Sequence, residues 1–363
     1  MRTVTRQRGA FLVVALSVFP LIVHFFTTSF RKSQNFKLCV ISRIRDVSLL
    51  LPQWLEFHIA AGVDHFFLTN DCSNDATLQW LTIPLYSASI SLSRNQSFNN
   101  CTQGANSKEG DLIDDTFQRA KAACEWTVLL DPDEYIFPTH FQPGALVSDY
   151  IANLSVPLLR LPWLVMSNNG YEKSVDGMTI VETFRSGSIF NKLKKTLVQS
   201  RYIKRWINPH HPEKFEYFSP KIGPYPLRDV SRPFYISDNE METNGRCTIP
   251  KAPLYIRHFQ TQAWHDFLVL RSNRRSPWFS GSEDDLRRIW RESNLQSSCL
   301  PPGDEFVSFI VSRMKNRLRD HSPSKFESFY KDWLKGTALT LDTSKRRRLL
   351  AADDSARALP TLV

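Results

Sequence analysis

The sequence lacks internal repeats and low-complexity stretches, and its 13 glycines among 363 residues are too few for the strict glycine period of collagen. Its composition is that of a globular protein, with 42% hydrophobic and 23% charged residues. Such a chain can bury a substantial core. The composition therefore excludes a fibrous or wholly disordered protein and predicts one large folded domain.

Cysteine pairs at C-x-x-C spacing, which are typical of zinc and thiol-redox motifs, are also absent. The six cysteines are scattered along the chain at Cys39, Cys72, Cys101, Cys124, Cys247 and Cys299. In an oxidising compartment six cysteines can form up to three disulfides in fifteen possible pairings, and the sequence does not choose among them. We expect Cys39, which lies in an apolar run, to be a small buried residue.

Acidic residues are absent from residues 1–32, which carry five lysines and arginines. Residues 337–363 carry five basic residues against three acidic ones, so the two ends account for most of the net charge of +10. A basic charge confined to the chain ends is weak evidence for a nucleic-acid groove. We therefore expect no nucleic-acid partner.

Residues 10–30 contain no aspartate, glutamate, lysine or arginine. As a helix, a segment of this length just crosses a hydrocarbon layer of about 30 Å. A cleaved signal peptide is the alternative, but its apolar region is shorter and precedes an A-x-A-like site that this sequence lacks. We predict a retained signal anchor.

The anchor divides the chain into parts of different character. They are a cytoplasmic end (1–9), the transmembrane anchor (10–30), a short stem (31–36), a folded domain (37–336) and a basic tail (337–363). N-glycosylation triplets begin at Asn95, Asn100 and Asn153, which is compatible with a luminal body. The prediction is a single-pass type II membrane protein that faces the lumen of the Golgi or the ER.

Short apolar runs alternate with helical patterns through the folded domain. Strands are predicted at 38–41, 63–69, 88–92, 126–130, 158–161 and 179–184, helices at 50–61, 114–123, 263–273 and 306–319, and a long loop at 204–233. Alternation of strand and helix is typical of a parallel sheet. We predict an α/β fold with a mostly parallel sheet flanked by helices.

Polar residues directly follow two of these strands, at residues 70–75 and 131–134. Open α/β sheets bind their ligands at the carboxyl ends of such strands. Asp131 and Asp133, on either side of Pro132, are hard oxygen donors that suit Mg²⁺ or Mn²⁺, and such an ion can neutralise a diphosphate. A lone D-x-D also occurs in ordinary solvated turns, so its context decides.

Several motifs in order resemble the metal-dependent GT-A glycosyltransferases, and within them glycosyltransferase family 92. They are residues 53–58, 62–63, 66–68, 70–75, 126–136, 161–163, 168–170, 194–196 with 210–211, and 258–259. The middle motif is similar to a W-x-x-x-x-D-x-D-E-[FY]-[IL] segment of that family. The resemblance covers about residues 37–275 and implies a Rossmann-like GT-A fold with a UDP-sugar donor. The expected donor is UDP-galactose.

The resemblance also implies roles for individual residues. Asn70, Asp71 and Asp75 are expected near the base and ribose of the nucleotide, while Asp131 and Asp133 address the metal and the diphosphate. The expected cofactor is therefore Mn²⁺ or Mg²⁺.

A third metal ligand is expected from the C-terminal half, with His258 or His211 as candidates. Neutral imidazole is a reasonable ligand for Mn²⁺. His58, on the inner face of a predicted helix, is instead expected to be a buried histidine satisfied by a hydrogen bond.

The resemblance suggests inversion at the sugar carbon, which needs a general base to take the proton of the acceptor hydroxyl. Glu182 is the first candidate and Asp176 the next, with Glu213 and Asp238 also open. Any of them can equally be a plain surface carboxylate.

Four aromatic residues can stack on sugar rings, with core packing as the alternative for most of them. They are Trp163, Tyr171, Trp206 and Trp264.

The sequence thus predicts an inverting glycosyltransferase that transfers a sugar from a UDP-sugar to a glycan acceptor. A non-catalytic luminal protein that keeps the fold and binds glycans or a partner is the alternative. A metal-dependent phosphohydrolase is less well supported, since no further Asp/His cluster of the two-metal type lies nearby in the sequence.

Overall fold

The computed structural model describes residues 36–94, 109–152, 154, 157–212, 214–215, 241–244, 247–250, 252–273, 282–295, 301, 303–321 and 330. The predicted anchor at 10–30 and the tail at 337–363 lie outside these residues. The same holds for Asn95, Asn100, Asn153, Glu213 and Asp238. Within the described part of the chain, no helix combines the length and the apolar character needed to span a bilayer.

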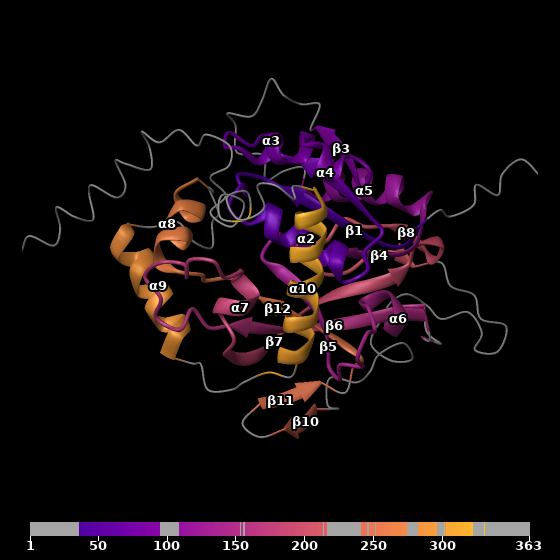
Figure 1. Ribbon diagram of the computed structural model, residues 1–363. Coiled ribbons are helices and arrows are strands. Elements are labelled where there is room, and N and C mark those ends of the chain that lie inside the picture. Colours follow the sequence, from indigo (N-terminus) through magenta and orange to yellow (C-terminus); the bar gives the residue numbers. More distant parts are fainter. Residues whose placement is uncertain are drawn as a thin grey trace, which may run out of the picture.

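An eight-stranded sheet forms the centre of the fold (Figure 1). Its strands are β1 (Phe36–Ile44), β2 (His65–Asn70), β3 (Ile90–Arg94), β4 (Cys124–Leu129), β5 (Glu134–Pro138), β6 (Leu158–Met166), β7 (Gly187–Gln199) and β12 (Leu254–His258). The strand order is β3-β2-β1-β4-β7-β6-β12-β5. Only β5 and β7 run against the other six strands of this sheet. The predicted α/β class with a mostly parallel sheet is confirmed.

The remaining elements are helices and two short hairpin-like pairs. The helices are α2 (Leu51–Ala60), α3 (Thr77–Thr82), α4 (Pro84–Ser87), α5 (Glu109–Lys121), α6 (Val147–Ala152), α7 (Ile180–Thr183), α8 (Trp264–Asn273), α9 (Glu283–Leu295) and α10 (Asp304–His321). The pairs are β8 (Ile203–Arg205) with β9 (Lys214–Phe215), and β10 (Met241–Asn244) with β11 (Cys247–Pro250).

The predicted strand at 179–184 is wrong, since this stretch contains the short helix α7 and the strand begins later, at Gly187. Thr179 and Glu182 form a capping box at the start of α7. This T-x-x-E pattern is a helix-start signal. The β-branched pair Ile180 and Val181 inside it favoured a strand in the prediction.

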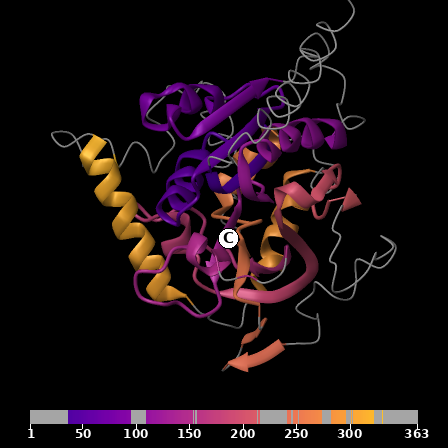
Figure 2. The same ribbon diagram turned by 90° about the vertical axis from the view of Figure 1, so that its right-hand side faces the viewer.

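The alternation of side chains along β1 explains the two layers of the fold. Leu38 and Val40 belong to the larger core, which includes apolar residues of α2 and α10. Cys39 and Ile41 belong to a second core, which includes Phe117 of α5. Successive strand residues point to opposite faces, so each core covers one face of the sheet. Figure 2 shows α10, in yellow-orange, along one side of the molecule.

Helix α2 is placed by its two ends. Proline is tolerated in the first turn of a helix, where Pro52 lies. Beyond the last turn, Gly62 has φ of +95°, and a Cβ atom there would lie 2.9 Å from Ser148 Oγ. Both the backbone conformation and the close approach require glycine.

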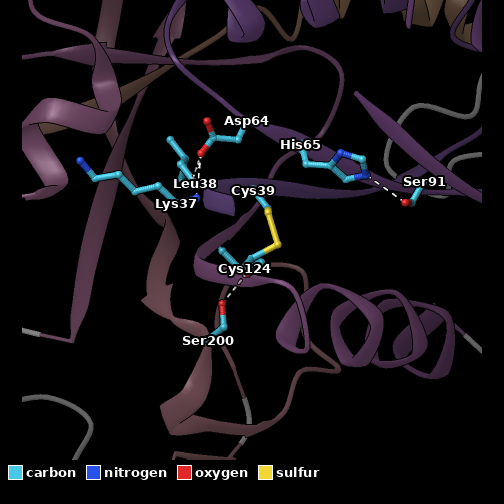
Figure 3. The surroundings of a disulfide bond; sticks show 9 residues. Lys37, Leu38, Cys39, Asp64, His65, Ser91, Cys124 and Ser200 are labelled. Atoms are coloured by element: carbon cyan, nitrogen blue, oxygen red, sulfur yellow. Dashed lines mark hydrogen bonds between the residues drawn. A yellow bond between two sulfur atoms is a disulfide. The ribbon is translucent and has the colours of Figure 1, made fainter. Parts of the chain in front are cut away.

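Cys39 and Cys124 form a disulfide between the neighbouring strands β1 and β4 (Figure 3). The expectation that Cys39 is only a small buried residue is therefore incomplete, because its side chain is both buried and bonded. Cys72 is also disulfide-bonded. An apolar run conceals a disulfide because cystine sulfur packs in a core as well as a methyl group does.

We predict that replacing Cys39 and Cys124 together by alanine lowers the free energy of unfolding by about 2–4 kcal/mol. The bond links residues 85 positions apart, so its loss frees a long loop in the unfolded chain. Urea denaturation under non-reducing conditions measures the effect. An unchanged unfolding midpoint in the double variant would contradict a stabilising role.

Helix α10 is tied to α2 by two arginines. Arg313 Nε donates to the carbonyl of Ala60 at 2.9 Å, and Arg317 Nε lies 3.2 Å from the buried Glu56 carboxylate. Burial raises the pKa of Glu56 to about 7, although Arg317 opposes the shift. Helix α10 is thus held to α2 partly through a carboxyl group whose pKa is near neutral.

The pKa of Glu56 predicts a pH dependence of stability. A carboxyl group with a raised pKa binds its proton more tightly in the folded chain, so its stabilisation is complete below about pH 4.5 and is lost as the pH rises toward 7. We expect Glu56→Gln to unfold like the parent protein at pH 5 and to be more stable by about 2 kcal/mol at pH 8.

Urea denaturation at both pH values tests this, with the exposed Glu305→Gln on α10 as the matched control. If Glu56→Gln and Glu305→Gln show the same pH dependence as the parent, Glu56 does not titrate near neutral pH.

Candidate active site

The carboxyl ends of the six parallel strands lie at one edge of the sheet. The chain leaves β1 toward Asp46, β2 toward Asp71 and β4 toward Asp131, while β12 ends at His258. The fold therefore brings both polar clusters of the sequence, and a histidine from the C-terminal half, to the same edge.

Asp131, Pro132, Asp133 and Glu134 form a tight turn between β4 and β5, which we call the acidic turn. Glu134 N–H donates to the carbonyl of Asp131 at 3.0 Å, and Asp131 N–H donates to Glu134 Oε2 at 2.9 Å. The indole N–H of Trp54, on α2, donates to the Glu134 carbonyl at 2.9 Å. The turn is thus closed by its own hydrogen bonds and held by a core helix.

Lys195 of β7 reaches into the acidic turn from a neighbouring strand. Its Nζ lies 2.9 Å from Asp131 Oδ2 and 3.3 Å from Glu134 Oε2. The side chains of Lys195 and Glu134 are fully buried, whereas that of Asp131 is 46% exposed. One oxygen of Asp131 is therefore engaged inside the protein while the carboxylate still reaches the surface.

Asp133 is paired with His258. His258 Nε2 lies 3.6 Å from Asp133 Oδ1, and the two side chains are only 10% and 8% exposed. The N–H of Phe259, next in the chain, donates to the Asp133 carbonyl at 2.8 Å. The end of β12 is therefore fastened to the acidic turn by both backbone and side chain.

These contacts shift the pKa values of Asp131, Glu134 and His258 in different directions. Burial raises the pKa of Asp131, but the Lys195 ammonium outweighs it and holds the pKa below its usual value. Burial raises the pKa of Glu134 to about 8 despite Lys195. Burial lowers the pKa of His258, but Asp133 and the neighbouring carboxylates raise it overall. Asp131 therefore remains the ionised member of the turn that faces solvent.

The side chains present have the chemistry of a divalent-cation site without a complete set of ligands. Among the described residues, no group of three or more His, Cys, Asp and Glu side chains could hold a metal ion as it stands. Two ligands that each lie about 2.1 Å from one ion are about 3–3.5 Å apart. The 3.6 Å between Asp133 Oδ1 and His258 Nε2 is close to this separation. Asp133 and His258 therefore fit as a pair, with Asp131 as the adjacent carboxylate.

The structure separates the two histidines of the predicted pair. His211 is exposed, and its Nδ1 lies 3.3 Å from the carbonyl of Pro212. His210 instead packs edge-on against Trp163, with 5.2 Å between ring centroids, and Trp163 packs against His258 at 4.5 Å. His210, which belongs to the motif at residues 210–211 but was not predicted as a metal ligand, is thus the member of the pair that lies nearer His258.

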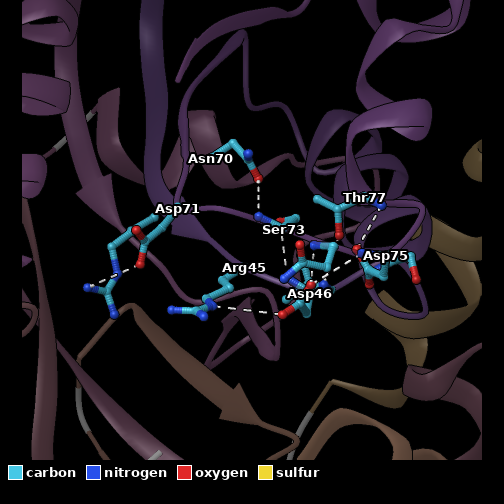
Figure 4. Close-up of polar contacts among 11 residues, drawn as sticks. Arg45, Asp46, Asn70, Asp71, Ser73, Asp75 and Thr77 are labelled. Carbon is cyan, nitrogen blue, oxygen red and sulfur yellow. Dashed lines mark hydrogen bonds and ion pairs between the residues drawn. The ribbon is translucent and has the colours of Figure 1, made fainter. Parts of the chain in front are cut away.

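The loop at residues 70–75 is held by a network of hydrogen bonds to the loop after β1 (Figure 4). Asp46 Oδ1 accepts from the N–H of Asn74 at 2.6 Å. Asp75 accepts from Ser48 N–H and from Thr77 N–H, each at 2.9 Å. Asp75 Oδ2 therefore joins the two loops, while its Oδ1 accepts from Thr77 in its own segment. Asp46, which was not predicted, also joins the two loops.

Asn70 and Asp71 are the members of the predicted nucleotide site that lie at the strand end itself. Asp71 is 2% exposed, and its Oδ2 lies 3.8 Å from Arg43 Nη1. Arg43 is 27% exposed and also lies 3.2 Å from Glu109 Oε1. Asn70 Oδ1 accepts from Ser73 N–H at 3.4 Å. A partly exposed arginine between two carboxylates was not predicted, because its partners are distant in the sequence.

The two described candidates for the general base lie in the loop between β6 and β7. Glu182 is occupied by structural contacts, since its Oε2 accepts from the N–H and the hydroxyl of Thr179, each at 2.8 Å. Its Oε1 lies 3.8 Å from Lys315 Nζ on α10. Asp176 is exposed, in the turn closed by Met178 N–H and the Val175 carbonyl.

The remaining predictions concern buried rings. Trp163, Trp206 and Trp264 are at most 6% exposed and pack in cores, whereas Tyr171 is 40% exposed. His58 is fully buried, and its Nδ1 lies 2.8 Å from the Trp54 carbonyl. Burial lowers the pKa of His58 to about 4. The prediction of a buried core histidine with a hydrogen bond is confirmed for Nδ1, whereas Nε2 has no hydrogen-bond partner among the described residues.

No protein-family model matches the sequence, and no curated protein matches it significantly. Among solved structures, the chain is similar to S. aureus TarS 1-349, with 13% identity and a TM-score of 0.32 over 86% of this chain and 92% of that chain. TarS 1-349 in complex with UDP gives 12% identity and 0.32 over 90% and 94%. The galactosyltransferase LgtC, in complex with donor and acceptor sugar analogs, gives 14% and 0.24 over 45% and 58%. The resemblance to family 92 stays a prediction.

The contacts of Glu182 predict that it stabilises α7 rather than moving a proton. Glu182→Ala removes the capping acceptor and is expected to lower the free energy of unfolding by about 1 kcal/mol. Glu182→Gln keeps an acceptor oxygen, because glutamine also serves in capping boxes, and should stay within about 0.5 kcal/mol of the parent.

Thermal or urea unfolding measures the difference between these two variants. A Glu182→Gln protein that unfolds like the parent but has lost at least about a hundredfold in kcat would instead identify Glu182 as the general base.

Proposed function

We propose that this protein is a glycosyltransferase of the GT-A type that transfers a sugar from a UDP-sugar to a glycan acceptor. The observation that carries the proposal is the acidic turn, which places Asp131 and Asp133 beside His258 at the carboxyl edge of the sheet. The loop with Asn70 and Asp71 follows β2 at the same edge. Ligands of open α/β sheets bind along such an edge.

Asp133, His258 and the carboxylate oxygen of Asp131 that does not face Lys195 are the groups that would hold a divalent cation, Mn²⁺ or Mg²⁺. The ion, when bound, neutralises charge on the departing diphosphate. Asn70 and Asp71, at the end of β2, are the residues proposed to contact the base and ribose of the nucleotide. The hydrogen bonds that close the acidic turn fix its backbone before any ligand binds, which favours binding through preorganisation.

The finer points of the proposal come from the resemblance to family 92. Galactose is the proposed sugar and inversion the proposed stereochemistry. Asp176 is the proposed general base, because its carboxylate is exposed whereas that of Glu182 caps a helix. His211 is retained only as a residue of the rim, since its ring is exposed away from the contacts of the turn.

The proposed location is the lumen of the Golgi or the ER, with residues 10–30 as the anchor of a type II membrane protein. The buried disulfide between Cys39 and Cys124 supports a luminal body, because stable disulfides form mainly in oxidising compartments.

We predict that the purified protein releases UDP from a UDP-sugar in the presence of Mn²⁺ and an acceptor glycan. Asp131→Ala and Asp133→Ala each remove a carboxylate that faces the cation and should lower this rate at least about a hundredfold. The exposed Asp284→Ala on α9 is the matched control and should leave the rate unchanged. Product analysis by mass spectrometry identifies the extended glycan and the donor sugar.

Equal UDP release by the parent and by both turn variants would overturn the proposal. A parent that binds UDP with Mn²⁺, seen as a rise in melting temperature, but extends no glycan would support the non-catalytic binding protein instead. A parent whose thermal stability does not respond to UDP and Mn²⁺ well above a micromolar dissociation constant would exclude a nucleotide site.

A further inference from the structure

We propose that Lys195 is a built-in counter-charge that makes cation binding at the acidic turn depend on the nucleotide. Its ammonium occupies one oxygen of Asp131, so the protein alone attracts a divalent cation weakly and binds it well only together with a diphosphate. This inference rests on the proposed function and deepens it by giving Lys195, which lies in the motif at residues 194–196, a positioning role that the resemblance does not assign.

The first ground is the place of the ammonium. Lys195 is fully buried and its Nζ lies 2.9 Å from Asp131 Oδ2, a charge-assisted distance. Its next contact is Glu134 Oε2 at 3.3 Å, and the ring of Trp163 lies 5.6 Å away. A buried ammonium without a partner is strongly destabilising, so the folded protein keeps the ion pair between Lys195 and Asp131.

The second ground is that the backbone of Lys195 is fixed. Strand β7 lies between β4 and β6, and Lys195 is in register with Leu161 of β6. Two residues further, Leu197 is in register with Val128 of β4. A lysine on a central strand, paired on both sides, cannot move away from the acidic turn as a surface lysine can.

The third ground is the charge of the site. Asp131 is paired with Lys195, and Asp133 is paired with His258, each from a different strand. A divalent cation that approaches Asp131 meets a carboxylate with one oxygen already engaged and an ammonium behind it. Because like charges repel strongly in a partly buried site, the apparent affinity for the cation alone falls.

A nucleoside diphosphate changes this balance. Its phosphate oxygens carry negative charge and provide further metal ligands on the exposed side of Asp131. Among the described residues, no protein group completes a metal site there. The cation and the diphosphate therefore each raise the affinity for the other, and by linkage both couplings are equal.

Lys194 provides the control that the chain itself offers. It precedes Lys195 on the same strand, and successive strand residues point to opposite faces. Its side chain is partly exposed, and burial together with Arg160 lowers its pKa. Lys194→Met and Lys195→Met therefore make the same chemical change on the two faces of β7.

The experiment measures Mn²⁺ binding by the electron paramagnetic resonance signal of free Mn²⁺, with and without UDP. For the parent we expect weak binding of Mn²⁺ alone and at least about tenfold tighter binding with UDP, a coupling of ordinary size. Lys195→Met should bind Mn²⁺ alone about tenfold more tightly than the parent, and the gain from UDP should shrink by a similar factor. Lys194→Met should behave like the parent.

Lys195→Met removes the polar partner of Glu134 Oε2, so Lys195→Met with Glu134→Gln serves as a second variant in which the neighbouring carboxyl group is replaced by a neutral amide. It should also bind Mn²⁺ alone more tightly than the parent, because Asp131 Oδ2 is released. Melting temperatures of all variants without ligands show whether each remains folded. The parent alone already tests the coupling, whether or not the variants fold.

Equal affinity of the parent for Mn²⁺ with and without UDP overturns the inference. A folded Lys195→Met protein that binds Mn²⁺ no better than the parent overturns it as well, while leaving the proposed glycosyltransferase function untouched. A parent that binds neither Mn²⁺ nor UDP in any combination removes the proposed function together with the inference.

Discussion

The buried ion pair between Lys195 and the acidic turn is the contact on which the rest of the site depends. It joins β7 to the connection between β4 and β5, over 64 positions of sequence, through Asp131 and Glu134. The same turn receives the indole N–H of Trp54 and offers its Asp133 carbonyl to Phe259. Strand β7, helix α2 and the end of β12 therefore all contact the acidic turn. Together these contacts hold Asp133 in its orientation toward His258.

The parallel sheet supplies the other constraint, because it collects the ends of strands that are far apart in the sequence. Six strands run in one direction, and polar loops follow β1, β2 and β4 at the same edge. Two of these loops are bound to each other through Asp46 and Asp75 before any ligand is present. Helix α10 packs in the same core as α2 and is joined to α2 through Arg317 and Glu56. The edge is thus rigid enough to present a few side chains in fixed positions.

Local patterns were sufficient for five of the eight strands of the central sheet, for four helices and for the two polar clusters. Apolar runs predicted β1, β2, β3 and β4 within a few residues, and Asp131 and Asp133 were found because they directly follow one of these runs. Helix α7 was missed because the Ile180–Val181 pair inside its capping box resembles a strand. The disulfide of Cys39 was missed because this cysteine lies in an apolar run like that of any buried strand. The roles of Lys195, Arg43 and Asp46 were missed because their partners are distant in the sequence and are brought close only by the fold.

In the sequence alone, a D-x-D motif is a pair of negative charges with no visible partner. The fold supplies a partner for each of the two carboxylates. Here each carboxylate has a cationic or hydrogen-bonding partner from another strand, Lys195 of β7 for Asp131 and His258 of β12 for Asp133. Lys195 reaches Asp131 because β7 lies between β4 and β6 in the sheet. Since burial of an unpaired carboxylate is costly, this compensation also permits three acidic residues within four positions of a buried turn. The chemistry of the motif is therefore set by the strand order as much as by its own residues.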